Sequence, residues 1–302
     1  MNITIESNQL KAEISTNGAE IQHLVKKSDG TELIWNGDVS VWKNHAPILF
    51  PYVGRCLNGY YTMDGKKCEN TTNHGFVRGS ETTVIAQEKD KVTFELTPND
   101  AIAARYPYKF ALQVSYEITD KDLNWKMTVI NKDDKPIKFA IGTHTAFACP
   151  RNTDPAGTEI SDYQIEFQKK EDIKSVVMND KGFVIPDGDG NYQVRPSLDQ
   201  KGIVPVTKEG FGTGLCVTGF DSEWIGLRNK KDNSLIKIST KGFPHAMLWQ
   251  NDKGDPQFVC IEPWYGLPDT AENDGNWETK LGLNTIQPGE KFESVQNISY
   301  EE

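Results

Sequence analysis

Hydrophobic and polar residues alternate along several stretches of this chain. Residues 111–119 and 123–129 each carry an apolar side chain at every second position, and the polar turn 119–122 lies between them. Such alternation predicts two strands that form a hairpin with one face buried. Polar turns at 88–90 and 231–234 separate further segments of this kind, which predicts two more hairpins. We therefore expect an all-β fold, a large antiparallel β-sandwich with few short helices.

Helical periodicity is almost absent from the sequence. The best helical segment is 100–105, and Tyr106-Pro107 should end it because the residue before a proline avoids helical backbone angles. Strand and helix patterns do not alternate, so a dinucleotide-binding fold is disfavoured. No internal repeat and no linker rich in proline and serine divides the chain. We predict that residues 1–302 form one β-sandwich domain.

The composition is that of an ordinary globular protein, with 302 residues, 37 % of them hydrophobic and 25 % charged. The net charge of −10 disfavours nucleic acid and anionic membranes as partners. The N-terminal segment lacks the basic start and the apolar run of a signal peptide. No stretch reaches the roughly 20 apolar residues that span a bilayer. The sequence therefore predicts a cytoplasmic protein and leaves its oligomeric state open.

Neither the cysteines nor the acidic residues predict a metal site. The segment 187–191 resembles the start of a calcium loop, but the twelfth position is Leu198, where a bidentate glutamate is required. Its Asp, Gly and Asn residues favour a turn instead. The cysteines are odd in number and widely spaced, which is typical of reduced thiols and disfavours a zinc site. We expect no metal and no cofactor. The cysteines are Cys56, Cys68, Cys149, Cys216 and Cys260.

Two of the five histidines lie in distinctive settings. His74 lies in the polar, glycine-flanked segment 73–79, and His144 directly follows an apolar strand. Histidine is the side chain best suited to proton transfer near neutral pH, and a polar group at a strand end often points into a cleft. The alternative for each is a structural histidine with satisfied ring nitrogens, which is the commoner case for this residue type.

Glu262 ends the apolar run 258–261 and precedes Pro263-Trp264. A carboxylate at the end of a buried strand beside aromatic rings should be partly desolvated, which raises its pKa and makes it a better base. The alternative is a carboxylate paired with an arginine or a backbone amide. Aromatic faces beside polar groups suit the mixed surface of a sugar, although most tryptophans are core residues. The tryptophans that flank the polar segments are Trp35, Trp42, Trp249 and Trp264.

Five short segments occur here in the order found in one enzyme family. They are Gly54-Arg55 before the turn Asn58-Gly59, then Asn73-His74-Gly75, Gly142-Thr143-His144, Ile261-Glu262-Pro263-Trp264 and Thr285-Ile286-Gln287-Pro288-Gly289-Glu290. Through them, nearly the whole chain resembles the aldose 1-epimerases, also called galactose mutarotases. The LacX-like branch is the most similar, and 73–78 also resembles the hexose-6-phosphate mutarotase branch. The resemblance implies a large antiparallel β-sandwich and a role in carbohydrate metabolism, that of lactose and galactose for this branch.

The resemblance also implies a reaction and the residues that perform it. Aldose 1-epimerases interconvert the α and β anomers of a hexose by opening and closing the ring, which requires an acid and a base but no cofactor. His144 corresponds to the general acid and Glu262 to the general base, while Arg55 and His74 correspond to sugar-binding residues. Gly242 stands where family members often have an acidic sugar contact, which implies a different pattern of recognised hydroxyls.

Other functions remain open at this point. A hexose-6-phosphate mutarotase would bind phosphate through Arg55 and Arg78, whose planar guanidinium groups suit phosphate oxygens. For either substrate, Trp35, Trp249 or Trp264 should lie near enough to contact the sugar. A carbohydrate-binding or sensor protein without catalysis would need neither an acid nor a base. A glycosidase ranks last because it requires paired carboxylates, and only Glu262 lies in a suitable segment. Under the mutarotase and sugar-binding hypotheses alike, the partner is a small sugar or sugar phosphate.

Overall fold

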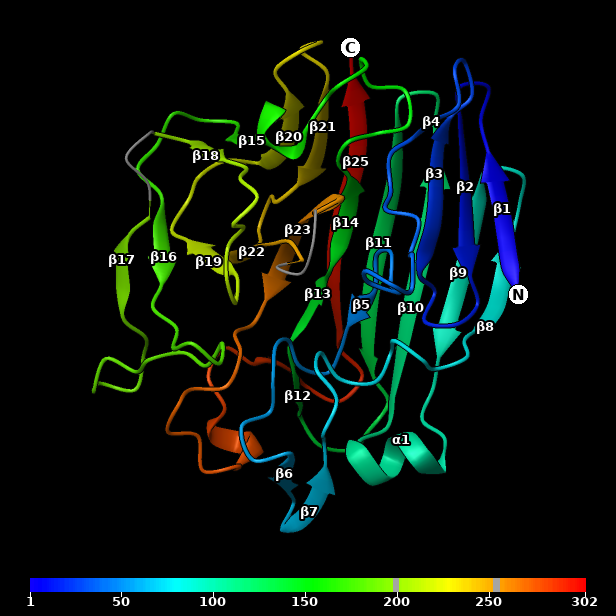
Figure 1. The fold of residues 1–302 in the computed structure, drawn as a ribbon. Coiled ribbons are helices and arrows are strands. Elements are labelled where there is room, and N and C mark those ends of the chain that lie inside the picture. The colour runs from blue at the N-terminus through cyan, green and yellow to red at the C-terminus, as the bar shows by residue number, and fades with distance from the viewer. Residues whose placement is uncertain (198–200, 252–255) are drawn as a thin grey trace.

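The computed structural model describes residues 1–197, 201–251 and 256–302, so Leu198 lies outside the described residues. The chain folds into two stacked layers of strands (Figure 1), and every pairing between its named strands is antiparallel. The one α-helix in these residues has six residues. The predicted all-β antiparallel sandwich is therefore confirmed.

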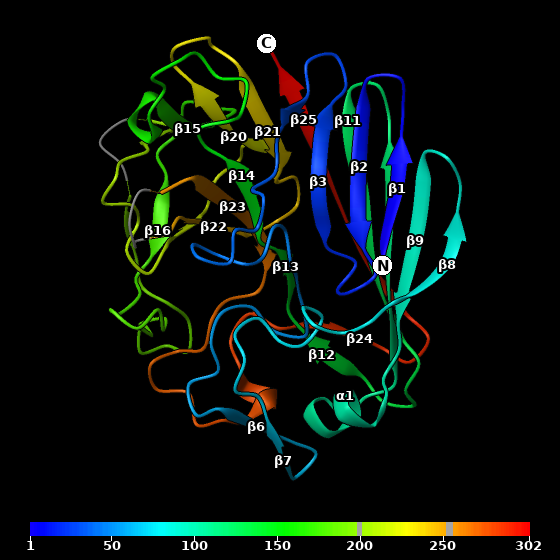
Figure 2. The same cartoon turned by 45° about the vertical axis from the view of Figure 1, so that its right-hand side comes forward.

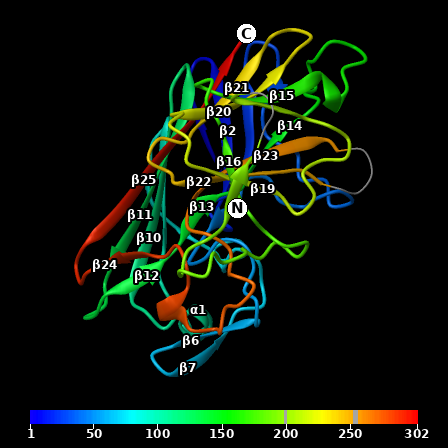
Figure 3. The same ribbon diagram turned by 90° about the vertical axis from the view of Figure 1, so that its left-hand side faces the viewer.

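One layer of the sandwich is a nine-stranded sheet, in which the long strands β25, β11 and β10 lie side by side (Figure 3). All three hairpins expected from the alternating patterns are confirmed in this sheet, as β8 with β9, β10 with β11 and β20 with β21. In order across the sheet, the strands are β18 (Ile203–Pro205), β15 (Tyr163–Phe167), β20 (Trp224–Asn229), β21 (Leu235–Ser239), β25 (Lys291–Glu301), β11 (Asp122–Asn131), β10 (Phe110–Ile118), β9 (Lys91–Leu96) and β8 (Thr83–Gln87).

The other layer contains an eight-stranded sheet and, beside it over β9 and β10, a four-stranded sheet (Figure 2). The eight-stranded sheet consists of β17 (Val194–Pro196), β16 (Lys174–Val176), β19 (Leu215–Thr218), β22 (His245–Trp249), β23 (Phe258–Tyr265), β13 (Ile141–Thr143) and β5 (Ile48–Leu49), with β14 (Thr145–Ala148) also paired to β23. The four-stranded sheet consists of β1 (Asn2–Glu6), β2 (Leu10–Ser15), β3 (Ile21–Lys26) and β4 (Thr31–Glu32).

Short elements gather at one end of the sandwich, the lower end in Figure 1. The helix α1 (Asp100–Arg105) has the predicted bounds, because Asn99 caps its first turn by accepting the Ile102 N–H at 2.9 Å and Tyr106 is already extended. No described helix is long and apolar enough to cross a membrane. The other short elements are the strand pairs β6 (Tyr60–Met63) with β7 (Lys66–Glu69) and β12 (Ile137–Phe139) with β24 (Asn284–Ile286), and the 3-10 turn η2 (Trp277–Thr279); a second 3-10 turn, η1 (Ile160–Asp162), precedes β15.

Side-chain alternation in the eight-stranded sheet separates the core from the site. On β23, Val259 and Ile261 pack into the core between the layers, whereas Cys260, Glu262 and Trp264 point to the opposite face. This outer face is where the functional side chains gather.

The segment 187–191 is a turn, as its composition suggested. The Asp187 carboxylate accepts the backbone N–H groups of Asp189 and Asn191 at 2.9 and 3.1 Å. This aspartate therefore stabilises its own turn through local hydrogen bonds.

Candidate active site

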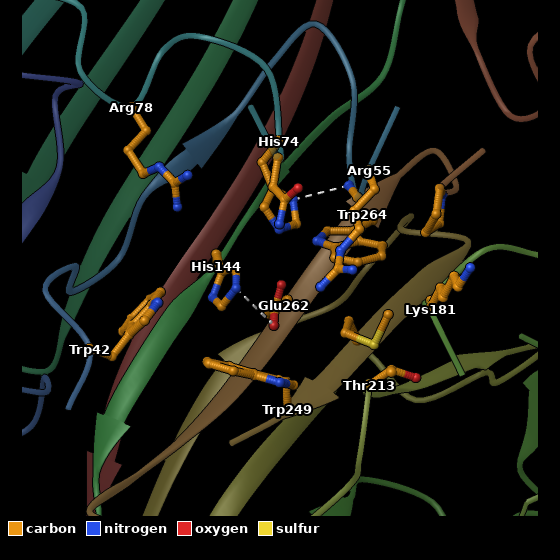
Figure 4. Close-up of a pocket in the computed structure, with 15 residues that line it drawn as sticks. Trp42, Arg55, His74, Arg78, His144, Lys181, Thr213, Trp249, Glu262 and Trp264 are labelled. Carbon is orange, nitrogen blue, oxygen red and sulfur yellow. Dashed lines mark hydrogen bonds and ion pairs between the residues drawn. The ribbon is translucent and has the colours of Figure 1, made fainter. Parts of the chain in front are cut away.

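The candidate site is a pocket of about 180 Å³ on the outer face of the eight-stranded sheet (Figure 4). Its floor comes from β22, β23 and the junction of β13 with β14, which lie next to one another in the sheet. Trp249 on β22, Glu262 on β23 and His144 at the junction point into it, while loops bring Arg55 and Lys181 to its rim. Segments that are far apart in sequence thus converge on one cavity.

His144 and Glu262 are cross-strand neighbours. Gly142 lies opposite Trp264, and the same register continues into β14, so His144 lies opposite Glu262. Their nearest atoms, His144 Nε2 and Glu262 Oε1, are 3.4 Å apart, as the dashed line in Figure 4 shows. Gly142 is required here, because a Cβ atom at this position would come within 2.5 Å of Trp264 Cδ1. Strand register therefore accounts for the approach of these two side chains.

The strand that carries Glu262 is longer than the sequence suggested. We expected the strand to end at Glu262, but β23 continues through Pro263 to Tyr265. A proline inside a sheet is tolerated where its missing N–H leaves no ladder bond unmade. The ladder between β23 and the β13–β14 line is interrupted at residues 143–144, opposite Pro263 and Glu262. Pro263 thus lies where the pairing of β23 with β13 and β14 is interrupted, and His144 lies at the same place.

Both members of this pair are buried without satisfying their polar atoms. His144 is 7 % exposed and Glu262 is 1 % exposed. Neither carboxyl oxygen of Glu262 nor His144 Nδ1 has a hydrogen-bond partner among the described residues, and 3.4 Å is long for a hydrogen bond. Buried polar groups are normally paired, so such atoms mark a site that is completed by a ligand.

Burial shifts the pKa of both groups. It raises the pKa of Glu262 well above its usual value, because the charged carboxylate loses its hydration. Burial, with nearby His74 and Arg78, lowers the pKa of His144 well below its usual value. Both shifts favour the neutral form of each group, whereas the family resemblance assigns a proton to His144 and a negative charge to Glu262.

His74 is held as a neutral hydrogen-bond donor. Its Nδ1 accepts the Gly54 N–H at 3.0 Å, so the ring proton resides on Nε2. Burial and the two nearby arginines lower the pKa of His74 to about 3, which keeps the ring uncharged. Arg105 of α1 donates to Thr72 Oγ1 at 2.6 Å and thereby fixes the segment before His74. An N–H donor of fixed orientation is thus available at the pocket wall.

Three cationic side chains line the same pocket, namely Arg55, Arg78 and Lys181. Among the described lining residues, Glu262 is the one carboxylate. Glu20 lies near Arg78, but its Oε1 accepts the His45 and Ala46 N–H groups, at 2.7 and 3.0 Å. The pocket is therefore locally rich in positive charge, although the whole chain is acidic.

Aromatic rings enclose His144 on two sides. The Trp42 ring stacks on it with 4.9 Å between centroids and 28° between planes, and Trp249 meets it edge-on at 5.6 Å. Trp264 lies against His74 at 5.9 Å. These rings exclude water from the imidazole and offer apolar surface to a ligand.

The comparisons with known proteins agree with this geometry. Residues 1–299 match the family described as aldose 1-epimerase. The chain belongs to the aldose 1-epimerase family. The family suggested by the sequence motifs is thereby confirmed, and membership supports an enzyme of the mutarotase type.

Several relatives resemble this family member along nearly its whole length. It is 28 % identical to the plasmid protein LacX of Lactococcus lactis subsp. lactis over 296 residues, 95 % of each chain. A galactose mutarotase related enzyme from Lactobacillus acidophilus superposes with a TM-score of 0.90 at 29 % identity, covering 100 % of this chain and 98 % of the other. A galactose mutarotase-like protein from Lactobacillus casei ATCC 334 gives 0.90 at 28 % identity, with 100 % of both chains covered.

One group of side chains in this aldose 1-epimerase fold has the composition of a metal site. Ligand atoms of His144, Cys260 and Glu262 all lie within 4.8 Å of one another. Metal binding needs a thiolate and a carboxylate, but burial raises the pKa of Cys260 and of Glu262 well above their usual values. Cys260 is also fully buried and does not line the pocket. The group therefore suits proton transfer better than a resident metal ion.

The structure brings every site residue selected from the sequence into this one pocket, while their roles stay predictions. Trp35 does not line the pocket and instead donates its Nε1–H to the Trp42 carbonyl at 2.7 Å. Gly242 also lies outside, in the turn before β22, where a Cβ would come within 2.8 Å of the Tyr265 hydroxyl. The implied loss of a sugar contact at Gly242 therefore has no counterpart in the pocket lining. The selected residues are Arg55, His74, Arg78, His144, Trp249, Glu262 and Trp264.

Sequence reasoning missed two polar side chains of the pocket. Lys181 and Thr213 lie in turns between short strands and reach the rim opposite His144. Neither belongs to a motif or to a periodic segment, so nothing in the sequence distinguished them from other surface residues. Trp42 was noted only as a flanking aromatic residue, and its stacking on His144 follows from a loop whose path the sequence does not specify.

Proposed function

We propose that this protein interconverts the α and β anomers of a hexose by acid–base opening and closure of the sugar ring. The observation that carries the proposal is the His144–Glu262 pair, two proton-transfer groups 3.4 Å apart at the floor of a pocket. The two oxygens that exchange protons during ring opening, O1 and O5, are both bonded to C1 of the sugar. Groups this close together can therefore reach both oxygens at once.

Substrate binding would complete the proton arrangement. Sugar hydroxyls that donate to the unpaired Glu262 oxygens stabilise the carboxylate and lower its pKa. The proton then moves to the neighbouring His144, which gives the protonated acid and ionised base that the family resemblance implies. Binding and activation of the pair are thus coupled.

Ring opening then needs two proton transfers. His144 Nε2 donates its proton to O5 as the electrons of the C1–O5 bond move to that oxygen. Glu262 accepts the proton of the O1 hydroxyl, whose electrons form the C1=O1 double bond. After rotation about C1–C2, O5 attacks the other face of the aldehyde, and the two groups exchange roles. No proton, electron or cofactor is consumed.

The other pocket residues orient the sugar. His74 Nε2–H and the Arg55 guanidinium are donors for hydroxyl or ring oxygens. Trp42 and Trp249 provide the apolar surface that sugar C–H groups require. A cavity of about 180 Å³ is well below the 300–1,000 Å³ of typical drug-sized sites, as expected for a single sugar ring.

Exchange spectroscopy by NMR tests the proposal directly. The protein should accelerate exchange between the anomers of at least one hexose in a panel that includes galactose and glucose. Binding of a sugar without accelerated exchange across the whole panel would instead identify a carbohydrate-binding or sensor protein.

A second candidate, a mutarotase for hexose 6-phosphates, is favoured by the positive charge of the pocket. Arg55, Arg78 and Lys181 line it together, and a phosphate group would satisfy several of their donors. If this candidate is correct, kcat/KM should be higher for glucose 6-phosphate than for glucose. Lys181→Gln should lower that preference, whereas Lys170→Gln, at an exposed lysine outside the pocket, should leave it unchanged. Equal kcat/KM for both sugars would exclude phosphate recognition.

A further inference from the structure

A second carboxylate lies fully buried beside the pocket without lining it. Asp269 follows β23 and is 0 % exposed. Its Oδ1 accepts Lys280 Nζ at 2.9 Å and the Tyr61 hydroxyl at 2.8 Å. Its Oδ2 accepts the Leu57 N–H at 2.8 Å. Lys280 is buried as well and donates to the Leu267 carbonyl at 2.9 Å. Both oxygens and the cation are therefore satisfied.

The contacts of Asp269 lead to the turn that carries Arg55. Leu57, whose N–H it accepts, is two residues beyond Arg55, and the Asp269 N–H points to the Arg55 carbonyl at 3.5 Å. The other side of Arg55 is held by His74, whose N–H donates to the Gly54 carbonyl at 2.8 Å. Arg55 is thus fixed between the segment of His74 and that of Asp269.

Asp269 also fixes a second wall of the pocket. Its carbonyl accepts the Val184 N–H at 2.9 Å, and the Val184 carbonyl accepts the Ala271 N–H at 2.8 Å. This pair of bonds joins the segment after β23 to the loop that carries Lys181, three residues before Val184. One buried residue therefore connects two loops that bring cations to the pocket.

We infer that Asp269, charge-balanced by Lys280, is a positioning residue that holds the Arg55 turn and the Lys181 loop in their sugar-binding arrangement. It does not line the pocket, and its effect passes through the backbone at Leu57 and Val184. Its kinetic consequences rest on the proposed function, while its structural consequences do not.

The chain offers a matched control for this inference. Asp154 is a second buried carboxylate that accepts a buried cation, Arg151 at 3.0 Å, as well as the Tyr163 hydroxyl and a backbone N–H. Neither Asp154 nor Arg151 lines the pocket. Changes at this pair measure the effect of losing a buried ion pair in this fold without disturbing Arg55.

The test removes both charges of each pair, so that no unpaired charge is left buried. The variants are Asp269→Asn with Lys280→Met, and Asp154→Asn with Arg151→Met as the control. We expect the first to raise KM about tenfold or more with kcat within about threefold, the pattern of lost binding rather than lost chemistry. The control should leave KM unchanged. An unchanged KM in the first variant, or an equal rise in the control, would overturn the inference.

A double-mutant cycle separates positioning of Arg55 from general destabilisation. In an Arg55→Ala background, Asp269→Asn with Lys280→Met should raise KM by a clearly smaller factor than in the native background, because Arg55 is already absent and only the Lys181 loop is left to be displaced. Tyr61→Phe, which removes one hydrogen bond to Asp269, should raise KM only a few-fold in the native background. Full additivity of the Arg55 and Asp269 changes would contradict the inference.

Hydrogen–deuterium exchange decides the matter even if no sugar proves to be a substrate. The charge-removed Asp269 variant should show faster amide exchange at residues 55–57 and 182–184 than the Asp154 control variant. Absence of anomer exchange with this pattern present would refute the proposed function alone. Unchanged exchange at both segments would refute the positioning role alone. If the double replacement does not fold, Tyr61→Phe against Tyr163→Phe provides the same comparison.

Discussion

Two buried carboxylates, Glu262 on β23 and Asp269 just beyond it, have opposite environments. Glu262 is 1 % exposed, and neither of its oxygens has a hydrogen-bond partner among the described residues. Asp269 is 0 % exposed, and its oxygens accept bonds from Lys280, Tyr61 and Leu57. Both carboxyl groups are equally buried, but only Asp269 has hydrogen-bond donors around it. The same residue chemistry is thus set up for proton transfer in one place and for rigid support in the other.

The difference shows how a sandwich can separate chemistry from support. A buried carboxyl without donors is costly in its ionised form and so holds its proton, ready to exchange it when a ligand brings donors. A buried carboxylate with a cation and two further hydrogen bonds has little reason to change state, and its removal leaves those donors unpaired.

Replacing Glu262 by Gln should have the largest effect on rate. The change keeps the shape but removes the group that exchanges a proton, so anomer exchange should slow by roughly 10²–10⁴-fold. The free energy of unfolding should stay equal or rise, because no hydrogen bond to this carboxyl is lost. Exchange NMR and denaturant unfolding measure the two quantities. A near-native rate in the folded variant would remove Glu262 from the mechanism.

Replacing His144 by Asn should slow exchange by about 10²-fold or more, because the ring nitrogen that shares the proton is lost. Sugar affinity, measured by calorimetry, should fall much less, since Arg55 and His74 remain. The double variant with Glu262→Gln should lose less than the sum of the two effects on the activation free energy, because the pair acts as one unit. Additive losses would show that the two groups act independently.

Replacing Asp269 by Asn should have the reverse profile of the Glu262 variant. Leaving the Lys280 charge buried without its partner should cost about 3–5 kcal/mol in the free energy of unfolding. Asp154→Asn, which leaves Arg151 with Asp232 at 4.0 Å as a second carboxylate, should cost somewhat less. Denaturant unfolding of the three variants gives the comparison. If Glu262→Gln destabilises as much as Asp269→Asn, the contrast between the two carboxyls is wrong.

The stability of the protein should depend on pH through Glu262. Burial raises the pKa of this group in the native state, so its native form binds the proton more tightly than the unfolded chain does. The stabilisation is full below the unfolded pKa of about 4.3 and is lost as pH rises toward the native pKa. The native protein should therefore lose stability relative to Glu262→Gln as the pH is raised from about 4.3. Parallel stability curves for the two proteins would show that Glu262 ionises freely.

Rate should follow the same titrations. Ring opening requires one proton on the pair, so the acid limb of kcat/KM belongs to protonation of His144 and the basic limb to ionisation of Glu262. Burial lowers the pKa of His144 and raises that of Glu262, which widens the active range on both sides. A pH profile confined between the ordinary pKa values of the two groups would contradict this assignment.

The sequence predicted the parts of the fold that local patterns determine. The β10–β11 hairpin and α1 follow from alternation, a polar turn and a proline stop, all of which act within a few residues. The motifs also contained six of the seven selected pocket residues, and Trp249 was selected as a flanking aromatic residue, although only the strand register explains why His144 meets Glu262. Register depends on contacts between distant segments, which no local pattern encodes.

The support around the site was not visible in the sequence. Asp269 and Lys280 lie in irregular segments, and their pairing depends on how the Leu57 turn and the Val184 loop pack against them. Lys181 reaches the pocket for the same reason, through the path of a loop. For Glu262, the expected strand end was wrong because Pro263 lies where the ladder is already interrupted.

The smallest effect is expected from removing metal ions. His144, Cys260 and Glu262 lie close enough to share a metal, but burial raises the pKa of Cys260 and of Glu262 and so favours their protonated forms. Anomer exchange should therefore persist within about twofold after treatment with EDTA and a thiol reductant, since acid–base ring opening needs neither metal nor disulfide. Cys260→Ser should likewise retain the rate, with Cys216→Ser, at another fully buried thiol, as the control for packing. Loss of activity in EDTA that one added metal restores, together with loss in Cys260→Ser alone, would turn this group into a metal centre and assign Glu262 to coordination instead of proton transfer.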